Sequence, residues 1–366
     1  KYADEFNLSL YSFNTTLLLG TTRVEISSPI ISSFKNFTYN TYQITNRDNG
    51  RTWPSIAKIS SLSKVFYCYA DLPYSSKISM PNRANLASID SKSFNLSLFN
   101  LEYERLLNKK APSEQFLVWL IGFTEGDGSF IIANRGDISF VITQDSRDIQ
   151  VLNMIKNNLE FGTVIRQGKT TSRYVVQDKL GLYLLATLFN NNLVTYSKIN
   201  SFNKFLSVLN EYNKKGRLYF PSLIIKNCNK SIMPTLQDDW LAGFTDSEGC
   251  FSVSISSTSN RFGICYDIAQ NHYENKKTLE LISILFKVGK VYPHSKKGAY
   301  YYRVSGLKNI VPLFPYFDKY PLRSKKLKSY ILWRELHRKL VKKDHLNSTL
   351  KESLKVLASK VNNTWD

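Results

Sequence analysis

A long motif occurs twice in this chain, and the duplication constrains the fold more than any other feature. The first copy runs from Trp119 to Phe130, and the second runs from Trp240 to Phe251. Both copies follow the pattern W-L-x-G-F-T-D/E-G/S-D/E-G-x-F. Two matches of this length indicate an internal duplication, and a repeated unit defines the architecture more firmly than a single element does. We therefore expect two copies of one supersecondary unit.

Each copy of the motif lies at the end of a predicted helix. Ser113 precedes apolar residues at helical spacing and is a suitable N-cap for the first helix. Thr235 stands three residues before Asp238, a spacing related to the capping box. The two motif helices are therefore expected to begin directly after Ser113 and Thr235.

The segments that follow the two motifs also repeat. Alternating apolar and polar residues predict a hairpin after each motif, over 129–144 in the first copy and 250–270 in the second. A helix, a second hairpin and two more helices follow in both copies. We predict an α+β fold of two pseudo-symmetric α-β-β-α-β-β-α repeats, with a saddle of antiparallel sheets over a central two-helix interface. The predicted divisions are an N-terminal extension of unknown role (1–112, partly extended and partly disordered), the first repeat (113–226), a linker (227–236), the second repeat (237–346) and a C-terminal helix and tail (347–366).

The charge of the chain points to a polyanionic partner. The 49 Lys and Arg residues outnumber the 29 Asp and Glu residues, for a net charge of +20. Neutralising phosphates with such a surface releases counterions, so nucleic acid is the expected partner rather than a membrane surface. Abundant Tyr, Phe, Asn and Ser fit an AT-rich genome such as a mitochondrial one.

Metal-binding cysteines and membrane spans are not expected. The four cysteines form no CxxC pair and the four His are scattered, so a zinc site is not predicted. We expect free thiols in a reducing compartment. The apolar run 116–123 is too short to span a bilayer. The sequence does not begin with Met, which is expected of a processed protein or of a reading frame that continues an upstream one.

Strand alternation predicts which face of each sheet is open. An antiparallel sheet covered by helices on one face leaves its other face free, and two such faces side by side would form a long polar trough. Arg, Lys, Gln and Ser in that trough suit contacts with base edges and phosphates, although a solvated strand face is the alternative for any one residue. The predicted contact residues are Ser129, Arg135, Ser139, Gln167, Lys169, Arg173, Gln177, Ser252, Ser254, Lys290, Tyr292, His294, Tyr301 and Arg303.

Two glycines within the motif helices indicate a helix–helix contact. Gly122 and Gly243 occupy mid-helix positions, where Gly costs up to about 1 kcal/mol relative to Ala. Close approach of two helix backbones explains that cost. The same contact would bring together Asp127 and Glu248 at the helix ends, where two carboxylates and the helix dipoles repel one another. A divalent cation such as Mg²⁺ relieves this repulsion, so we predict a metal-dependent nuclease centre, with helix capping as the alternative role of both acids.

The two motifs resemble the LAGLIDADG motif of homing endonucleases and related intron maturases, over about residues 113–345. The resemblance carried by Leu120–Gly128 and Leu241–Gly249 implies a monomer that cuts both strands of a long DNA site and leaves 3′ overhangs. It implies Mg²⁺, with Mn²⁺ as a substitute. It also implies an organelle-encoded protein of the mitochondrial matrix, or less readily of the chloroplast.

The resemblance also implies the residues of the active site. Its metal-binding acids correspond to Asp127 and Glu248, with backbone carbonyls offered by Gly126 and Ser247. A polar residue at the end of the second strand and a Lys near the start of the last helix complete each half. These correspond to Gln144, Gln270, Lys198 and Lys326, with Lys325 as a rival to Lys326.

Three functions are compatible with this sequence. The leading hypothesis is a site-specific double-stranded DNA endonuclease that promotes intron homing. The second is a maturase that binds its host intron RNA and assists group I intron splicing, either instead of cleavage or in addition to it. The third is a DNA-binding protein with an inactive centre. Both motif acids are present, and this favours the endonuclease.

Overall fold

The computed structural model describes residues 94–215 and 232–363 in full, and describes strands between residues 16 and 59 by their backbone. The chain divides into two compact units, residues 1–87 and residues 88–366. The first unit contains one antiparallel sheet in the order β1-β2-β4-β3, with β5 paired to β4. Its strands are β1 (Thr16–Leu19), β2 (Thr22–Ile26), β3 (Ile30–Phe34), β4 (Phe37–Asp48) and β5 (Arg51–Ile59). The disorder expected within 1–112 falls on positions outside the described residues.

The second unit begins earlier than the predicted first repeat. Helix α1 (Ser97–Leu107) belongs to this unit and not to the extension. Its Tyr103 hydroxyl donates to the Leu159 carbonyl at 3.2 Å, and the Tyr183 hydroxyl donates to Glu102 at 3.1 Å. Helix α1 is therefore an addition to the core of the first repeat.

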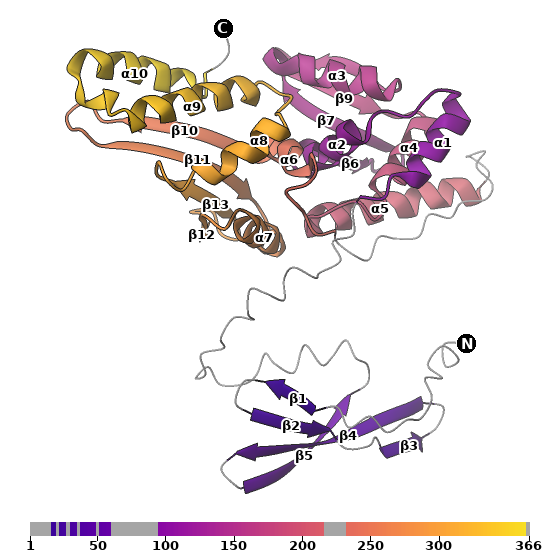
Figure 1. Cartoon of the computed structure of the whole chain (residues 1–366). Coiled ribbons are helices and arrows are strands. Elements are labelled where there is room, and N and C mark those ends of the chain that lie inside the picture. The colour runs from indigo at the N-terminus through magenta and orange to yellow at the C-terminus, as the bar shows by residue number, and fades with distance from the viewer. Residues whose placement is uncertain are drawn as a thin grey trace. The chain divides into compact units, whose positions relative to one another are not determined.

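Both repeats contain the predicted α-β-β-α-β-β-α order, and in each a second helix follows the last one of that order (Figure 1). The first comprises α2 (Glu114–Asp127), β6 (Gly128–Ile132), β7 (Ile138–Asp145), α3 (Ile149–Leu159), β8 (Thr163–Gln167), β9 (Thr171–Val176), α4 (Lys179–Phe189) and α5 (Tyr196–Lys214). The second comprises α6 (Trp240–Glu248), β10 (Gly249–Ile255), β11 (Phe262–Gln270), α7 (Lys276–Phe286), β12 (Lys290–Pro293), β13 (Tyr300–Ser305), α8 (Phe314–Lys319) and α9 (Lys326–Val341), followed by α10 (Ser348–Lys360).

The two four-stranded sheets have the same topology, which confirms the predicted fold class. Their strand orders are β6-β7-β9-β8 and β10-β11-β13-β12, with every pairing antiparallel. Figure 1 shows the two sheets on either side of the α2–α6 pair. Among the described residues, no helix is both long and apolar enough to cross a membrane.

The motif helices α2 and α6 touch at their glycines, as predicted. A Cβ on Gly122 would lie 2.9 Å from the Phe244 nitrogen and would clash with the Trp240 carbonyl. A Cβ on Gly243 would lie 2.8 Å from the Phe123 nitrogen and would clash with the Trp119 carbonyl. Each glycine therefore faces the backbone of the opposite helix, where no side chain has room.

The start of the second motif helix differs from its prediction. Helix α2 begins after Ser113, whose hydroxyl accepts from the Phe116 nitrogen at 3.3 Å. Helix α6 begins only at Trp240, and its N-cap Asp239 makes no side-chain cap bond. The expected start after Thr235 was wrong because Asp238 accepts from both the Thr235 hydroxyl and the Trp240 nitrogen, which fixes a turn before the helix.

The Phe that ends each motif anchors an aromatic core against the last helix of its repeat. Phe130 packs against Phe202 and Phe205 of α5, with ring centroids 5.2 and 5.5 Å away. Phe251 packs against Trp333 of α9 at 5.1 Å. Because α5 and α9 carry the predicted active-site lysines near their first turns, this packing positions them relative to the motif.

Candidate active site

The two motif acids lie at adjoining helix ends. Asp127 is the last residue of α2 and Glu248 is the last residue of α6. A Cβ on Gly126 would lie 2.5 Å from the Ser247 Cβ and 2.7 Å from the Glu248 Cγ. A side chain at position 126 would require Ser247 and Glu248 to shift, and the two helix ends therefore lie side by side.

Burial acts on both carboxyl groups, and the charge of Asp127 also acts on Glu248. Burial raises the pKa of Asp127, although Lys326, the hydrogen bond from Gln144 and Lys198 lower it in part. Burial also raises the pKa of Glu248, and the negative charge of Asp127 raises it further. The two acids thus interact directly, and both would be more readily ionised beside an added cation.

The predicted glutamines contact the acids of their own repeats. The Gln144 Nε2 donates to the Asp127 Oδ2 at 2.5 Å. A hydrogen bond from Gln270 lowers the pKa of Glu248, and the Gln270 Oε1 accepts from the Asn275 Nδ2 at 2.9 Å. Each amide therefore fixes the orientation of one carboxylate.

The predicted lysines reach the same region. The Lys198 ammonium donates to the Gly128 carbonyl, and the Lys326 ammonium donates to the Ser247 carbonyl at 2.8 Å and to the Thr245 carbonyl at 3.2 Å. Burial lowers the pKa of both lysines, and the charges of Asp127 and Glu248 raise it again in part. The charge of each lysine therefore interacts with both carboxylates.

Lys326, rather than Lys325, belongs to this cluster. Lys325 is the residue before α9, and its backbone nitrogen donates to the Asp148 Oδ2 at 3.4 Å. The charges that act on its side chain come from Asp148, Arg147 and Asp145, not from the motif acids. The two lysines are adjacent in sequence, but only the side chain of Lys326 reaches the motif.

The first acid of each motif joins the motif helix to the segment that leads to the lysine. Glu125 accepts from the nitrogens of Val194 and Thr195 and from the Thr195 hydroxyl. Burial raises the pKa of Glu125 to about 7, although these hydrogen bonds and Lys198 lower it in part. Asp246 accepts in the same way from the nitrogens of Arg323 and Ser324. The predicted structural role of Glu125 and Asp246 agrees with these contacts.

Two residues that the sequence pattern did not single out connect the repeats. Asp148 of the first repeat accepts from the Lys325 nitrogen at the start of α9. Asn275 of the second repeat donates to the Ser197 Oγ at 2.9 Å and accepts from the Ser197 nitrogen at 3.3 Å, at the start of α5. Each lysine helix is therefore held by residues of both repeats. Asp148 and Asn275 lie at matching positions shortly after Gln144 and Gln270, and this placement is the sequence signal from which they could have been identified.

The predicted DNA-contact residues on strands lie on the face opposite the core. Thr143 pairs with Arg173, and Tyr292 pairs with Tyr301, so these side chains share the open faces of the two sheets. Tyr292 and Tyr301 stack at 5.6 Å. Those on strands are Ser129, Ser139, Gln167, Arg173, Ser252, Ser254, Lys290, Tyr292, Tyr301 and Arg303, whereas Lys169, Gln177 and His294 lie in turns or just beyond a strand.

Three features of the open face add to the prediction. Arg135 lies in the turn between β6 and β7, where it pairs with Asp137. Arg303 is not free for a ligand as it stands, since it forms a two-pronged ion pair with Asp267 at 2.6 and 2.9 Å. Ile131 and Ile165 expose 38% and 48% of their surface, so the first sheet also offers apolar contacts.

The residues present fit a divalent cation between the two motif acids. Two partly buried carboxylates with raised pKa values lie at adjoining helix ends, and this donor set suits a hard cation that prefers oxygen ligands. Among the described residues no cluster of three His, Cys, Asp or Glu side chains forms, so carbonyl, phosphate or water oxygens would complete the coordination. The Ser247 carbonyl already accepts from Lys326 and has one lone pair left.

Two of the four cysteines, Cys250 and Cys265, lie in the described part of the chain. Cys250 and Cys265 form no disulfide, and Cys68 and Cys228 lie outside the described residues.

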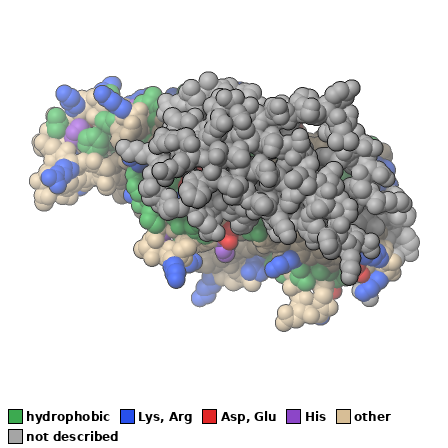
Figure 2. Space-filling model, turned by 90° about the horizontal axis from the view of Figure 1, so that it is seen from below, with side chains coloured by type: hydrophobic (Ala, Val, Ile, Leu, Met, Phe, Trp, Pro, Cys, Tyr) green, Lys and Arg blue, Asp and Glu red, His purple; other side chains and the backbone are tan. Residues whose placement is uncertain are grey.

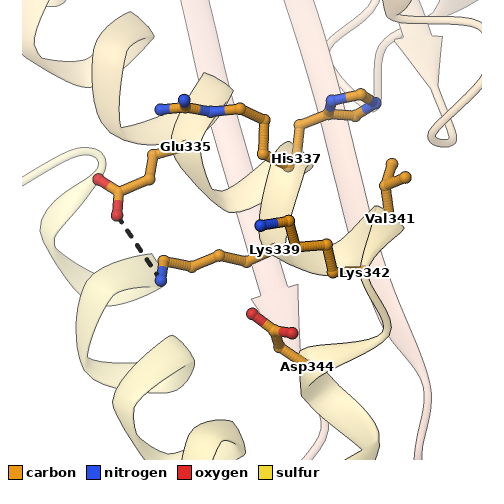
Figure 3. Close-up of a pocket in the computed structure, with 7 residues that line it drawn as sticks. Glu335, His337, Lys339, Val341, Lys342 and Asp344 are labelled. Atoms are coloured by element: carbon orange, nitrogen blue, oxygen red, sulfur yellow. Dashed lines mark ion pairs between the residues drawn. The ribbon is translucent and has the colours of Figure 1, made fainter.

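Figure 2 shows Lys and Arg side chains scattered over the visible part of one face. A hollow of about 450 Å³ lies along α9, lined by residues that include Glu335, Lys339 and Asp344 (Figure 3). None of the predicted site residues lines it, so it is separate from the motif acids.

Comparison with known families agrees with the geometry. The family model for the LAGLIDADG endonuclease matches residues 120–209 and 241–337, which together make up just over half of the chain. This chain belongs to the LAGLIDADG endonuclease family. Both matched segments begin at the motif and extend into the last helix of the repeat, so the family model covers both halves of the candidate site.

Relatives of this LAGLIDADG chain are intron-encoded proteins of fungi. It is 35% identical to the probable intron-encoded endonuclease 4 of Neurospora crassa. This alignment of 236 residues covers 63% of this chain and 41% of that protein. It is 26% identical over 168 residues to the intron-encoded RNA maturase bI4 of Saccharomyces cerevisiae, over 44% of this chain and 24% of that protein. The chain therefore spans less than half the length of these two relatives.

Solved structures share the fold of the second unit. The LAGLIDADG homing endonuclease I-GzeII, in complex with its DNA target, aligns with a TM-score of 0.54 and 22% identity over 67% of this chain and 97% of its own. I-SmaMI, bound to uncleaved DNA in the presence of calcium ions, aligns with a TM-score of 0.54 and 20% identity over 67% and 98%. These alignments agree with the two-repeat α+β architecture.

Proposed function

We propose that this protein is a site-specific endonuclease that hydrolyses one phosphodiester in each strand of a DNA duplex, leaves 3′ overhangs and promotes intron mobility. The observation that carries the proposal is the convergence of Asp127, Glu248, Lys198 and Lys326 at the paired helix ends. Two acids and two lysines related by a pseudo-two-fold axis suit two hydrolytic events on opposite strands.

The residues of the site divide the chemistry between them. Asp127 and Glu248 offer oxygen ligands to Mg²⁺, for which Mn²⁺ would substitute, and the carbonyls of Gly126 and Ser247 are further candidate ligands. When bound, the cation would neutralise charge that builds on the phosphate. Lys198 and Lys326 add positive charge close to the reacting phosphates and stabilise the transition state. Gln144 and Gln270, named above as partners of the acids, keep the carboxylates oriented.

The open faces of the two sheets are the proposed DNA-binding surface. Polar side chains there suit base edges and phosphates, and the exposed Ile131 and Ile165 suit thymine methyl groups. A net charge of +20 would favour association with either DNA or RNA. We propose that one chain acts as a monomer, since both halves of the site lie on it, and that it works in the mitochondrial matrix.

Maturase activity is the second proposed function, alone or together with cleavage. The similarity to an intron-encoded RNA maturase favours it, with group I intron RNA as the partner. To separate the two functions, the protein is incubated with Mg²⁺ and a plasmid that carries the intronless insertion site. Linearised plasmid supports the endonuclease. An uncut plasmid together with tight binding to the intron RNA would support the maturase instead.

As the pH is lowered, cleavage is expected to stop at a higher pH than it would if the two carboxyl groups had their usual pKa values. The pKa values of Asp127 and Glu248 are raised above the usual value of about 4. Protons therefore compete with the cation as the pH falls toward those raised values, and the charged acids are recovered as it rises. Single-turnover rates measured against pH at several Mg²⁺ concentrations should show an acid limb that moves to lower pH as Mg²⁺ increases. A limb that ignores Mg²⁺ would contradict this competition.

Replacing Arg173 with Ala is expected to weaken one half of the DNA site. Arg173 lies on the open face of β9, and its Nε is buried without a partner among the described residues. A lost two-pronged contact with guanine costs about 1–3 kcal/mol. Binding to duplexes that vary one half-site at a time measures this loss, and Arg334→Ala, on helix α9, is the control. Equal loss on every sequence would assign Arg173 to a phosphate instead.

A further inference from the structure

The two motif tryptophans occupy equivalent places but have different partners. Trp119 and Trp240 are both fully buried, and each stacks on the Phe four residues later with ring centroids 4.8 Å apart. The Trp119 Nε1 donates to the Asp246 Oδ2 at 2.8 Å. The Trp240 Nε1 is buried without a hydrogen-bond partner in the described part of the chain. The pseudo-symmetry of the motif is therefore broken at one hydrogen bond.

The bond from Trp119 crosses the interface between the repeats. Its acceptor Asp246 belongs to the second motif and is itself buried. Asp246 also accepts from the Arg323 nitrogen at 2.7 Å and from the Ser324 nitrogen at 3.2 Å. The Arg323 guanidinium lies 5.6 Å from the Trp119 ring centroid. Trp119 therefore contacts the segment before α9 in two ways, through Asp246 and through Arg323.

This segment leads directly to Lys326. Ser324 lies two residues before Lys326, and its Oγ accepts from the Lys326 nitrogen at 3.2 Å. The Lys326 ammonium then reaches the Ser247 and Thr245 carbonyls beside Glu248. A shift of Asp246 would therefore move the first turn of α9 and the ammonium that it carries. In the other half, Glu125 holds the segment before Lys198 through Val194 and Thr195.

We propose that Trp119 is a positioning residue for the second half of the active site. Its indole N–H fixes Asp246, and Asp246 fixes the start of α9 and hence Lys326. The first repeat thereby sets the geometry of the lysine in the second repeat, whereas the indole N–H of Trp240 has no acceptor among the described residues. The catalytic consequence rests on the proposed endonuclease function, but the contact itself does not.

The pair of tryptophans provides its own matched control. Trp119→Phe removes the indole N–H and keeps an aromatic ring, and Trp240→Phe makes the same change at the equivalent place without that bond. On a duplex labelled on both strands, Trp119→Phe should slow cleavage of one strand by about two- to tenfold, the effect of one hydrogen bond. The other strand should keep its rate, and Trp240→Phe should change neither. Equal slowing of both strands, or identical behaviour of the two variants, would overturn the proposal.

Amide hydrogen exchange of the free protein tests the contact without any cleavage. Trp119→Phe should speed exchange at residues 323–324 and leave residues 194–195 unchanged, and Trp240→Phe should alter neither. Unchanged exchange at 323–324 in Trp119→Phe would overturn the proposal even if the unaltered chain cuts no DNA. That failure to cut would instead refute the proposed function. If Trp119→Phe does not fold, benzothienylalanine at position 119 keeps the ring shape and lacks only the N–H.

Discussion

Replacing Asp127 with Asn is expected to abolish double-strand cleavage while leaving DNA binding intact. The change removes one of the two negative charges that would hold the cation, but keeps an oxygen in the same place. Losing a group of this kind costs about a hundredfold or more in rate. Folding should not suffer, because burial raises the pKa of Asp127 and the folded chain therefore disfavours its charged form. We expect the melting temperature to stay the same or to rise.

The same change in the second motif, Glu248→Gln, should have the same effect. Asp344→Asn is the matched control, since this carboxylate lines the hollow along α9 and lies away from the motif acids. Cleavage of a plasmid, binding to its target duplex and thermal melting are measured for all three variants. Full cleavage by Asp127→Asn would refute the assignment of this acid to the metal. Cleavage lost together with stability would indicate a structural role.

Replacing Gly122 with Ala should destabilise the protein, although helix propensity predicts the opposite sign. Ala is favoured over Gly inside a helix by about 1 kcal/mol. Here the added Cβ would meet backbone atoms of Trp240 and Phe244, which cannot rotate away as a side chain can. Overpacking costs about 1–3 kcal/mol and occasionally more, so we expect a net loss near the upper end. The melting temperature should then fall by roughly 5–10 °C.

Gly243→Ala should behave in the same way, because it meets the Trp119 carbonyl and the Phe123 nitrogen. Ser201→Ala is the control, since Ser201 is exposed on α5 and the change should stay within about 0.5 kcal/mol. Thermal and chemical unfolding of the three variants measure these differences. A stabilised Gly122→Ala would show that the two motif helices do not approach as closely as described.

Much of the site was predictable because the local sequence pattern and the duplication identify its residues and the elements that hold them. The motif repeats position by position, so Asp127 and Glu248 could be paired from the amino-acid sequence alone. Two-residue alternation located the hairpins, and the repeated downstream pattern located a helix after the first hairpin of each copy, observed as α3 and α7. In each case one short segment contains the whole signal, as it does for amphipathic elements in general.

The remainder depended on contacts between distant segments. Asp148 and Asn275 hold helices in the opposite repeat, at residues 177 and 78 positions away in sequence, and no local period encodes such a bond. The late start of α6 depends on how Asp238 divides its hydrogen bonds between Thr235 and Trp240. The bond from Trp119 to Asp246 has no counterpart at Trp240 among the described residues, so the duplication itself argued against it.

Mapping both cut positions on one target duplex would test the proposed hydrolytic centre. The DNA carries the joined sequence of the intronless insertion site, is labelled on both strands and is incubated with the protein and Mg²⁺ or with a chelator. We predict one cut in each strand, staggered to leave 3′ overhangs, that requires the cation and disappears in both Asp127→Asn and Glu248→Gln. Cuts that persist in those variants or with the chelator would contradict the assignment of DNA hydrolysis to the paired motif acids.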